Sequence, residues 1–135
     1  MKLIVAGSRS FTDYNLVRDK LDYYLKDVKE DVEIVSGRCS TGEYTFTTNR
    51  GDLVYGADGL GEKYAERSVL KVKAFPADWN LGRKAGPLRN IQMVEYATHL
   101  VAFWDGESTG TKNVIDLARE KGLKVRVVMI GPIKI

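Results

Sequence analysis

The apolar residues of this chain are arranged in two different patterns. Short, nearly continuous apolar runs are typical of parallel strands buried on both faces, and segments with apolar residues every three or four positions are typical of amphipathic helices. The five apolar runs lie at residues 2–6, 32–35, 72–75, 99–104 and 124–130. Their alternation with helical segments predicts an α/β fold. We expect a Rossmann-like, doubly wound, mainly parallel five-stranded sheet, covered by helices on both faces, in a single domain over residues 1–135.

The predicted helices have recognisable ends and inner faces. The second helix is expected over residues 61–69. Pro87 suits the first turn of the third helix, where its missing N–H leaves no bond unmade. The predicted buried face of that helix consists of Leu88, Ile91, Val94 and Ala97. The fourth helix, residues 112–121, is expected to end at Gly122.

Residues 39–55 form an insertion after the second strand. Apolar side chains alternate with polar ones on both sides of a turn at residues 49–52, which predicts a β-hairpin. Its predicted apolar face consists of Tyr44, Phe46, Leu53 and Tyr55. A lone hairpin is marginal in water, so this face must pack on the domain's rim, the ligand or a second subunit, and we expect a homo-oligomer. A lid over the ligand and a purely decorative hairpin are alternatives.

Composition restricts the class of protein and its partners. With 44% hydrophobic and 29% charged residues the chain is globular, and no apolar run approaches a membrane span, so we expect no membrane partner. The single cysteine, Cys39, permits no intrachain disulfide, which favours a reducing, cytoplasmic location and a structural role for Cys39. A net charge of +3 is compatible with a phosphorylated ligand but too small to predict nucleic acid as a partner.

The loop after the fourth strand is the first candidate for a binding site. It consists of glycines, hydroxyls and an acid and leads into a helix, and a helix N-terminus presents free N–H groups and a positive dipole end to an anion, most often a phosphate. The candidate residues are Trp104, Asp105, Gly106, Ser108, Thr109, Gly110 and Thr111. The alternative is an ordinary strand-to-helix turn, in which Thr109 or Thr111 caps the helix.

Three further loops follow strands at the same sheet edge. Ligands of open α/β sheets bind at that edge, so we expect these loops to converge on one crevice. The candidates are Gly7, Ser8 and Arg9 in the first loop; Ser36 and Gly37 with Gly56, Ala57 and Asp58, on the two sides of the insertion, in the second; and Arg83, Lys84, Arg89 and Asn90 in the third. Solvated basic loops are the alternative. Trp79 and Trp104 are candidates to stack on a base, with core or rim packing as the alternative.

We expect neither a metal nor another cofactor. His99 has no second ligand-type residue at metal spacing, so a structural role is expected for it.

Five ordered motifs resemble one known family. They are Gly-Ser-Arg-Ser-Phe-Thr-Asp at 7–13, Ser-Gly at 36–37 leading to Gly-Ala-Asp at 56–58, Phe-Pro-Ala-Asp-Trp at 75–79, Gly-Pro-Leu-Arg-Asn at 86–90, and Phe-Trp-Asp-Gly at 103–106 with Gly-Thr-Lys at 110–112. The chain resembles the YspA-type (DUF2493) branch of the SLOG superfamily, related to Lonely-Guy/lysine-decarboxylase-like phosphoribohydrolases and to DprA. The resemblance implies a Rossmann-like sheet with a pocket for nucleotides or nucleotide-derived ligands.

Two departures from the family pattern bear on function. The hairpin insertion splits what similar proteins keep as one compact Ser-Gly-Gly-Ala-Arg-Gly-Ala-Asp loop. Lonely-Guy-like enzymes also carry a catalytic Glu three residues after the Thr of their Gly-Thr motif, and Val114 stands at that position here. Valine cannot do acid–base chemistry, which counts against that hydrolytic mechanism.

Three functions remain open at this point. The leading one is a sensor or sequestering module that binds a nucleotide or an ADP-ribose-like molecule. The second is a hydrolase that cleaves a nucleotide at its N-glycosidic or phosphate linkage, with a carboxyl from Asp58, Glu62, Asp105 or Glu107. DprA-like binding of single-stranded nucleic acid is the weakest, because it requires a long basic stripe.

Overall fold

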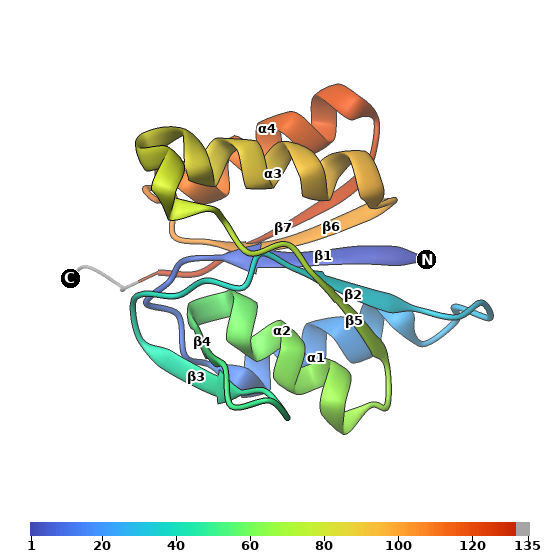
Figure 1. Ribbon diagram of the computed structural model, residues 1–135. Helices are drawn as coiled ribbons and strands as arrows, with labels where there is room; N and C mark the ends of the chain where they lie inside the picture. The colour runs from blue at the N-terminus through green and yellow to red at the C-terminus, as the bar shows by residue number, and fades with distance from the viewer. Residues whose placement is uncertain (132–135) are drawn as a thin grey trace.

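The computed structural model describes residues 1–131, and it has the α/β architecture with a hairpin insertion that the sequence predicts (Figure 1). The elements are, in order, β1 (Lys2–Gly7), α1 (Tyr14–Leu25), β2 (Glu33–Ser36), β3 (Tyr44–Thr47), β4 (Leu53–Tyr55), α2 (Gly56–Arg67), β5 (Lys71–Ala74), the 3-10 helix η1 (Trp79–Lys84), α3 (Ala85–Tyr96), β6 (His99–Trp104), α4 (Thr109–Lys121) and β7 (Lys124–Met129). Residues 132–135 of the predicted domain lie outside the described residues. None of the helices within residues 1–131 is both long and apolar enough to cross a membrane.

The five-stranded sheet has the order β5-β2-β1-β6-β7, and all four strand pairings are parallel. Helices α1 and α2 cover one face and α3 and α4 the other (Figure 1). The chain builds outward from β1 to β2 and β5, then crosses back to place β6 on the other side of β1. The strand order therefore reverses between β1 and β6, and such a reversal opens a crevice at the carboxyl ends of the strands.

Two apolar layers fill the space between sheet and helices. Along β1, Leu3 and Val5 pack toward α1 and α2, whereas Ile4 and Ala6 pack toward α3 and α4. This alternation is the two-residue period of a strand, and both faces are buried because both are covered. Burial of each aliphatic side chain stabilises the folded state by about 1.5–3 kcal/mol. A slip of one residue would move every side chain to the opposite face, so the two layers fix the register of the central strands.

Helix α2 begins at Gly56, five residues before the predicted start. Gly56 has φ +58°, and a Cβ there would lie 2.3 Å from the Arg9 Cα. Only glycine tolerates both the left-handed backbone and the close approach. The helix therefore starts directly at the end of the hairpin, with no intervening loop.

The inner face of α3 is only partly the predicted one. Leu88 and Ile91 are 43% and 38% exposed, whereas Val94 and Ala97 are buried as expected. The buried stripe consists of Asn90, Met93, Val94 and Ala97. The hydrophobic pattern did not predict this stripe because it contains the polar residue Asn90. The Asn90 amide donates to the Asn113 side chain at 2.9 Å, so this face of α3 is turned toward α4.

The hairpin packs on its own domain. Val54, which the predicted apolar face omitted, is fully buried, whereas Tyr44 and Leu53 are 55% and 51% exposed. Thr45 Oγ1 donates to the Gly56 carbonyl at 2.8 Å. A Cβ on Gly59 would lie 2.0 Å from Thr45 Oγ1. The absence of a side chain at Gly59 thus lets the hairpin lie flat against α2.

Candidate functional site

A pocket of about 830 Å³ lies at the carboxyl ends of the strands, where the sheet order reverses. The loops after β1, β2, β5 and β6 form its wall, and α3 and α4 begin at its edge. The sequence-predicted site residues that line it are Gly7, Ser8, Arg9, Asp58, Trp79, Arg83, Arg89, Asn90, Asp105, Ser108, Thr109, Gly110 and Thr111. The expected convergence of separate loops is therefore observed.

Seven predicted site residues do not line the pocket: Ser36, Gly37, Gly56, Ala57, Lys84, Trp104 and Gly106. Several of them instead support its wall. The N–H groups of Gly56 and Ala57 donate to the carbonyls of Glu43 and Ser8, so these two amides are not available to a ligand. The Trp104 indole N–H donates to the Ser108 carbonyl at 3.1 Å, which ties the β6 strand end to the start of α4.

Helix α4 presents its N-terminus to the pocket. Its cap is Ser108, and not Thr109 or Thr111 as in the alternative of an ordinary turn: the Ser108 hydroxyl accepts from the Thr111 N–H. Asp105 accepts from the N–H groups of Glu107 and Ser108 at 2.9 and 2.8 Å, and these bonds hold its pKa below the ordinary value. Thr109 and Gly110 come next on the pocket wall, in the first turn, where backbone N–H groups have no partner within the helix.

A second helix, α3, also begins at the pocket. Its first turn contributes Gly86 and Pro87 to the wall, and Arg83 and Arg89 lie on either side of that turn in the sequence. Asn90 donates to the Gly110 carbonyl at 3.3 Å and so joins the first turns of α3 and α4. Two positive dipole ends and the arginines therefore face the same space.

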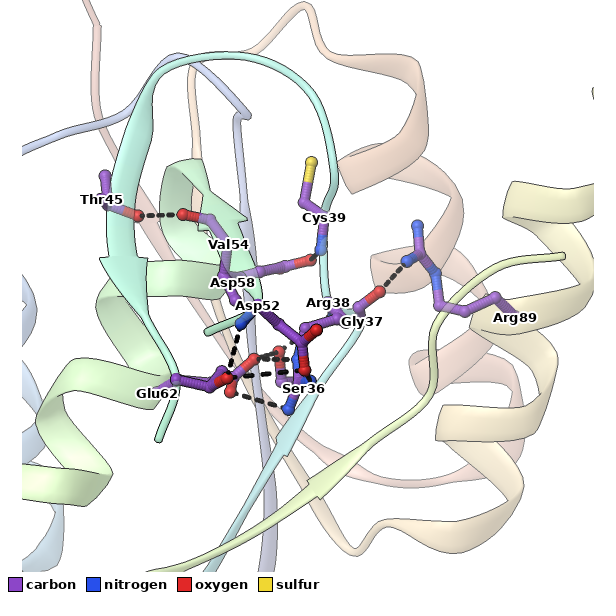
Figure 2. Close-up of polar contacts among 11 residues, drawn as sticks. Ser36, Gly37, Arg38, Cys39, Thr45, Asp52, Val54, Asp58, Glu62 and Arg89 are labelled. Carbon is purple, nitrogen blue, oxygen red and sulfur yellow. Dashed lines mark hydrogen bonds and ion pairs between the residues drawn. The ribbon is translucent and has the colours of Figure 1, made fainter. Parts of the chain in front are cut away.

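The segment after β2 is held between the two helix layers. Figure 2 shows Asp58 and Arg89 approaching it from two sides. Asp58 Oδ2 accepts from the Cys39 N–H at 3.0 Å, and an Arg89 Nη1 donates to the Gly37 carbonyl. A Cβ on Gly37 would lie 2.6 Å from Arg89 Nη1 and 3.0 Å from Asp58 Oδ2, so only glycine fits between them.

Asp58 is a buried carboxyl on the pocket wall. Its burial raises the pKa to about 6, and the nearby Glu62 raises it further, against the opposing effects of Arg89 and the Cys39 N–H. At neutral pH the group is therefore largely ionised but protonates within reach of physiological pH. The same burial, with the charge of Asp58, raises the pKa of the Cys39 thiol, which makes it a poor nucleophile and agrees with the structural role expected for it.

A buried ion pair behind Asp58 was not expected from the sequence. Glu62 is 3% exposed, receives two hydrogen bonds from the Arg38 guanidinium at 2.8 and 3.0 Å, and accepts a third from the Ser36 hydroxyl at 2.7 Å (Figure 2). Arg38 also reaches Asp52 in the hairpin turn at 3.5 Å. The available signal was the spacing of Asp58 and Glu62, which puts two acids on one face of α2.

The pocket contains more positive than negative side chains. Its charged lining residues are Arg9, Arg38, Arg83, Arg89, Asp58, Asp105 and Glu107. The lining residues that the prediction did not include as site residues are Ala6, Ser10, Arg38, Cys39, Thr41, Ala77, Gly86, Pro87, Met93, Glu107, Asn113 and Val114. Within residues 1–131 no three His, Cys, Asp or Glu side chains are grouped so as to hold a metal ion.

The chain is similar to a phage protein along most of its length. The chain is 28% identical to the Gene 61 protein of Mycobacterium phage D29 over 131 residues, which cover 92% of this chain and 93% of that protein. No family model matches the sequence, and no solved structure matches it. The similarity thus extends over nearly the whole of both chains. The name of that protein states no activity, so function is argued from the geometry of the pocket.

Proposed function

We propose that the pocket binds a nucleotide or a nucleotide-derived, ADP-ribose-like ligand, and that the protein is a sensor or sequestering module of the SLOG type. The observation that carries this proposal is the convergence of two helix N-termini and three arginines, Arg9, Arg83 and Arg89, on one pocket. Free amides, positive dipole ends and guanidinium groups are the donors that bind phosphate.

A base has an aromatic partner in the same pocket. Trp79 lines it and is 58% exposed, which is unusual for a large apolar side chain that could otherwise pack inward. Stacking of a base on an exposed indole buries both surfaces and contributes about 1–3 kcal/mol. The volume of about 830 Å³ lies within the range of small-molecule sites.

Binding without turnover is favoured over hydrolysis by a residue in the second turn of α4. Val114 lines the pocket at the position where Lonely-Guy-like enzymes carry their catalytic Glu. An aliphatic side chain supplies no proton, so the pocket lacks that acid at that place. The single free thiol of Cys39 supports a reducing, cytoplasmic location for such a module.

Calorimetric titration with AMP, ADP, ADP-ribose, adenosine and inorganic phosphate tests the proposal. We expect at least one phosphorylated nucleotide to bind about tenfold more tightly than adenosine. Trp79→Ala should weaken nucleotides but leave inorganic phosphate unchanged, since only the base contacts the indole. Chromatography of the same mixtures should find no released base or phosphate. Absence of binding by every nucleotide would contradict the proposal, and released product would favour the hydrolase.

The hairpin is the surface that we propose for self-association. Tyr44 and Leu53 stay exposed, although Val54, next to Leu53 in β4, is buried. A symmetric pairing of two copies would cover these side chains. Light scattering should show a dimer or larger species for the parent and a smaller mass for a Tyr44→Lys, Leu53→Lys double variant. A monomeric parent would contradict the self-association but not the nucleotide pocket.

A further inference from the structure

Asp58 has one carboxyl oxygen that the protein uses and one that it does not. Oδ2 accepts from the Cys39 N–H at 3.0 Å, whereas Oδ1 accepts no hydrogen bond from residues 1–131. Every fully buried side-chain nitrogen and oxygen in that part of the chain has a partner, so Oδ1 must be open to the pocket that Asp58 lines. The pocket therefore contains a nearly buried hydrogen-bond acceptor that lacks its donor.

The neighbouring charged groups do not supply that donor. Arg89 donates to the Gly37 carbonyl and, at 3.0 Å, to the Asn90 side chain, and no ion pair joins it to Asp58 among the described residues. Glu62, one helical turn further along α2, has both oxygens occupied by Arg38. On this face of α2, both carboxyl oxygens of Glu62 are therefore used within the protein, whereas Oδ1 of Asp58 is available to a ligand.

The free oxygen, Asp58 Oδ1, favours a ligand that offers it a hydrogen-bond donor. A carboxylate repels phosphate, so the phosphate must lie elsewhere, and the first turn of α4 offers it amides. That helix follows β6, which lies two strands from β2 in the sheet, about 10 Å away at the usual spacing. Asp58 touches the segment directly after β2. The pocket thus places a hydroxyl acceptor at some distance from an anion site, which matches a sugar that bears a phosphate.

We propose that Asp58 accepts a hydrogen bond from a ribose hydroxyl and makes the pocket selective for ribonucleotides over deoxyribonucleotides. This inference rests on the proposed nucleotide function. Hydroxyls donate short, charge-assisted hydrogen bonds to carboxylates, and a ligand without the hydroxyl leaves the buried oxygen unpaired.

The hydrogen bond to the Cys39 N–H does not by itself account for the charge of Asp58. The Cys39 N–H needs only one acceptor, and the neutral amide of asparagine would serve equally well without burying an ion. The retention of an ionisable group at a site where burial raises its pKa to about 6 agrees with a second use for the carboxyl.

The test compares ADP with 2′-deoxy-ADP and 3′-deoxy-ADP by calorimetry at pH 7.5. We expect at least one deoxy analogue to bind the parent protein about tenfold more weakly than ADP, the effect of losing a hydrogen bond to a charged group. In Asp58→Asn the affinity for ADP should fall to that of the weaker analogue, and the affinity for that analogue should change little. Asp116→Asn removes the same charge from an exposed position of α4 outside the pocket and should keep the discrimination.

The outcomes separate the two proposals. Equal affinities of the parent for all three nucleotides would overturn the role of Asp58 while leaving the nucleotide pocket intact, and this comparison needs no variant to fold. Discrimination that persists in folded Asp58→Asn would also overturn it. If none of these three nucleotides binds, and AMP and ADP-ribose do not bind either, the proposed function fails and this inference fails with it.

Discussion

Burial of the Asp58 carboxyl should lower the stability of the protein at neutral pH, and Asp58→Asn should remove that effect. The pKa is about 6 in the folded protein against 3.8 as the ordinary value. Between these values the folded state holds a proton that the unfolded state has released. Stability therefore falls as pH rises through this window, because the folded state then binds more protons than the unfolded one.

The magnitude follows from the shift. A change of about two pKa units corresponds to about 3 kcal/mol between pH well below 4 and pH 7.5, of which about 2 kcal/mol falls between pH 4.5 and 7.5. Asparagine does not titrate and can still accept from the Cys39 N–H. The unfolding free energy of Asp58→Asn minus that of the parent should therefore increase by about 2 kcal/mol from pH 4.5 to pH 7.5.

Urea unfolding, followed by circular dichroism at several pH values in this range, measures the difference. Titrations that the two proteins share cancel in the subtraction. Asp116→Asn, on the exposed side of α4, should alter the unfolding free energy by less than about 0.5 kcal/mol throughout. A difference between Asp58→Asn and the parent that does not change with pH would mean that burial does not raise the pKa of Asp58.

Three further substitutions test the site and its support. Arg89→Ala should weaken a phosphorylated nucleotide by about 1.5–3 kcal/mol and its nucleoside much less; an equal loss in calorimetry would mean that Arg89, which also holds the Gly37 carbonyl, only supports the fold. Gly110→Glu should abolish nucleotide binding and keep the melting temperature, because a Cβ there meets nothing within 4 Å while the new charge opposes an anion. Glu62→Gln should lower the unfolding free energy by about 2 kcal/mol, since it leaves Arg38 without its buried partner; an unchanged urea midpoint would contradict this.

The five strands and their alternation with helices could be predicted because a strand that is buried on both faces is a continuous apolar run. The 99–104 strand was predicted at its observed bounds. The β7 strand ends at Met129, one residue before the predicted end. The convergence of loops on one edge also followed from topology, since parallel strands place all their carboxyl ends together.

The misplaced details depend on polar contacts that join distant residues. Asn90 belongs to the buried face of α3 because Asn113 on another helix accepts from its amide, which no hydrophobic period reveals. Glu62 is buried only because Arg38, 24 residues earlier, pairs with it. Gly56 and Ala57 are predicted site residues that do not line the pocket, and the Glu43 and Ser8 carbonyls accept from their N–H groups. Such partners are fixed by packing, and sequence spacing does not determine them.

If the pocket binds as we propose, the first turns of α3 and α4 hold the phosphate end of a nucleotide. Titration of ¹⁵N-labelled protein with ADP, followed by amide chemical shifts, tests it most directly. We expect the largest shifts at the amides of Gly86, Thr109 and Gly110, together with the Trp79 indole. Shifts confined to the opposite end of the sheet, around Glu30 and His99, or no shifts at saturating ADP, would contradict it.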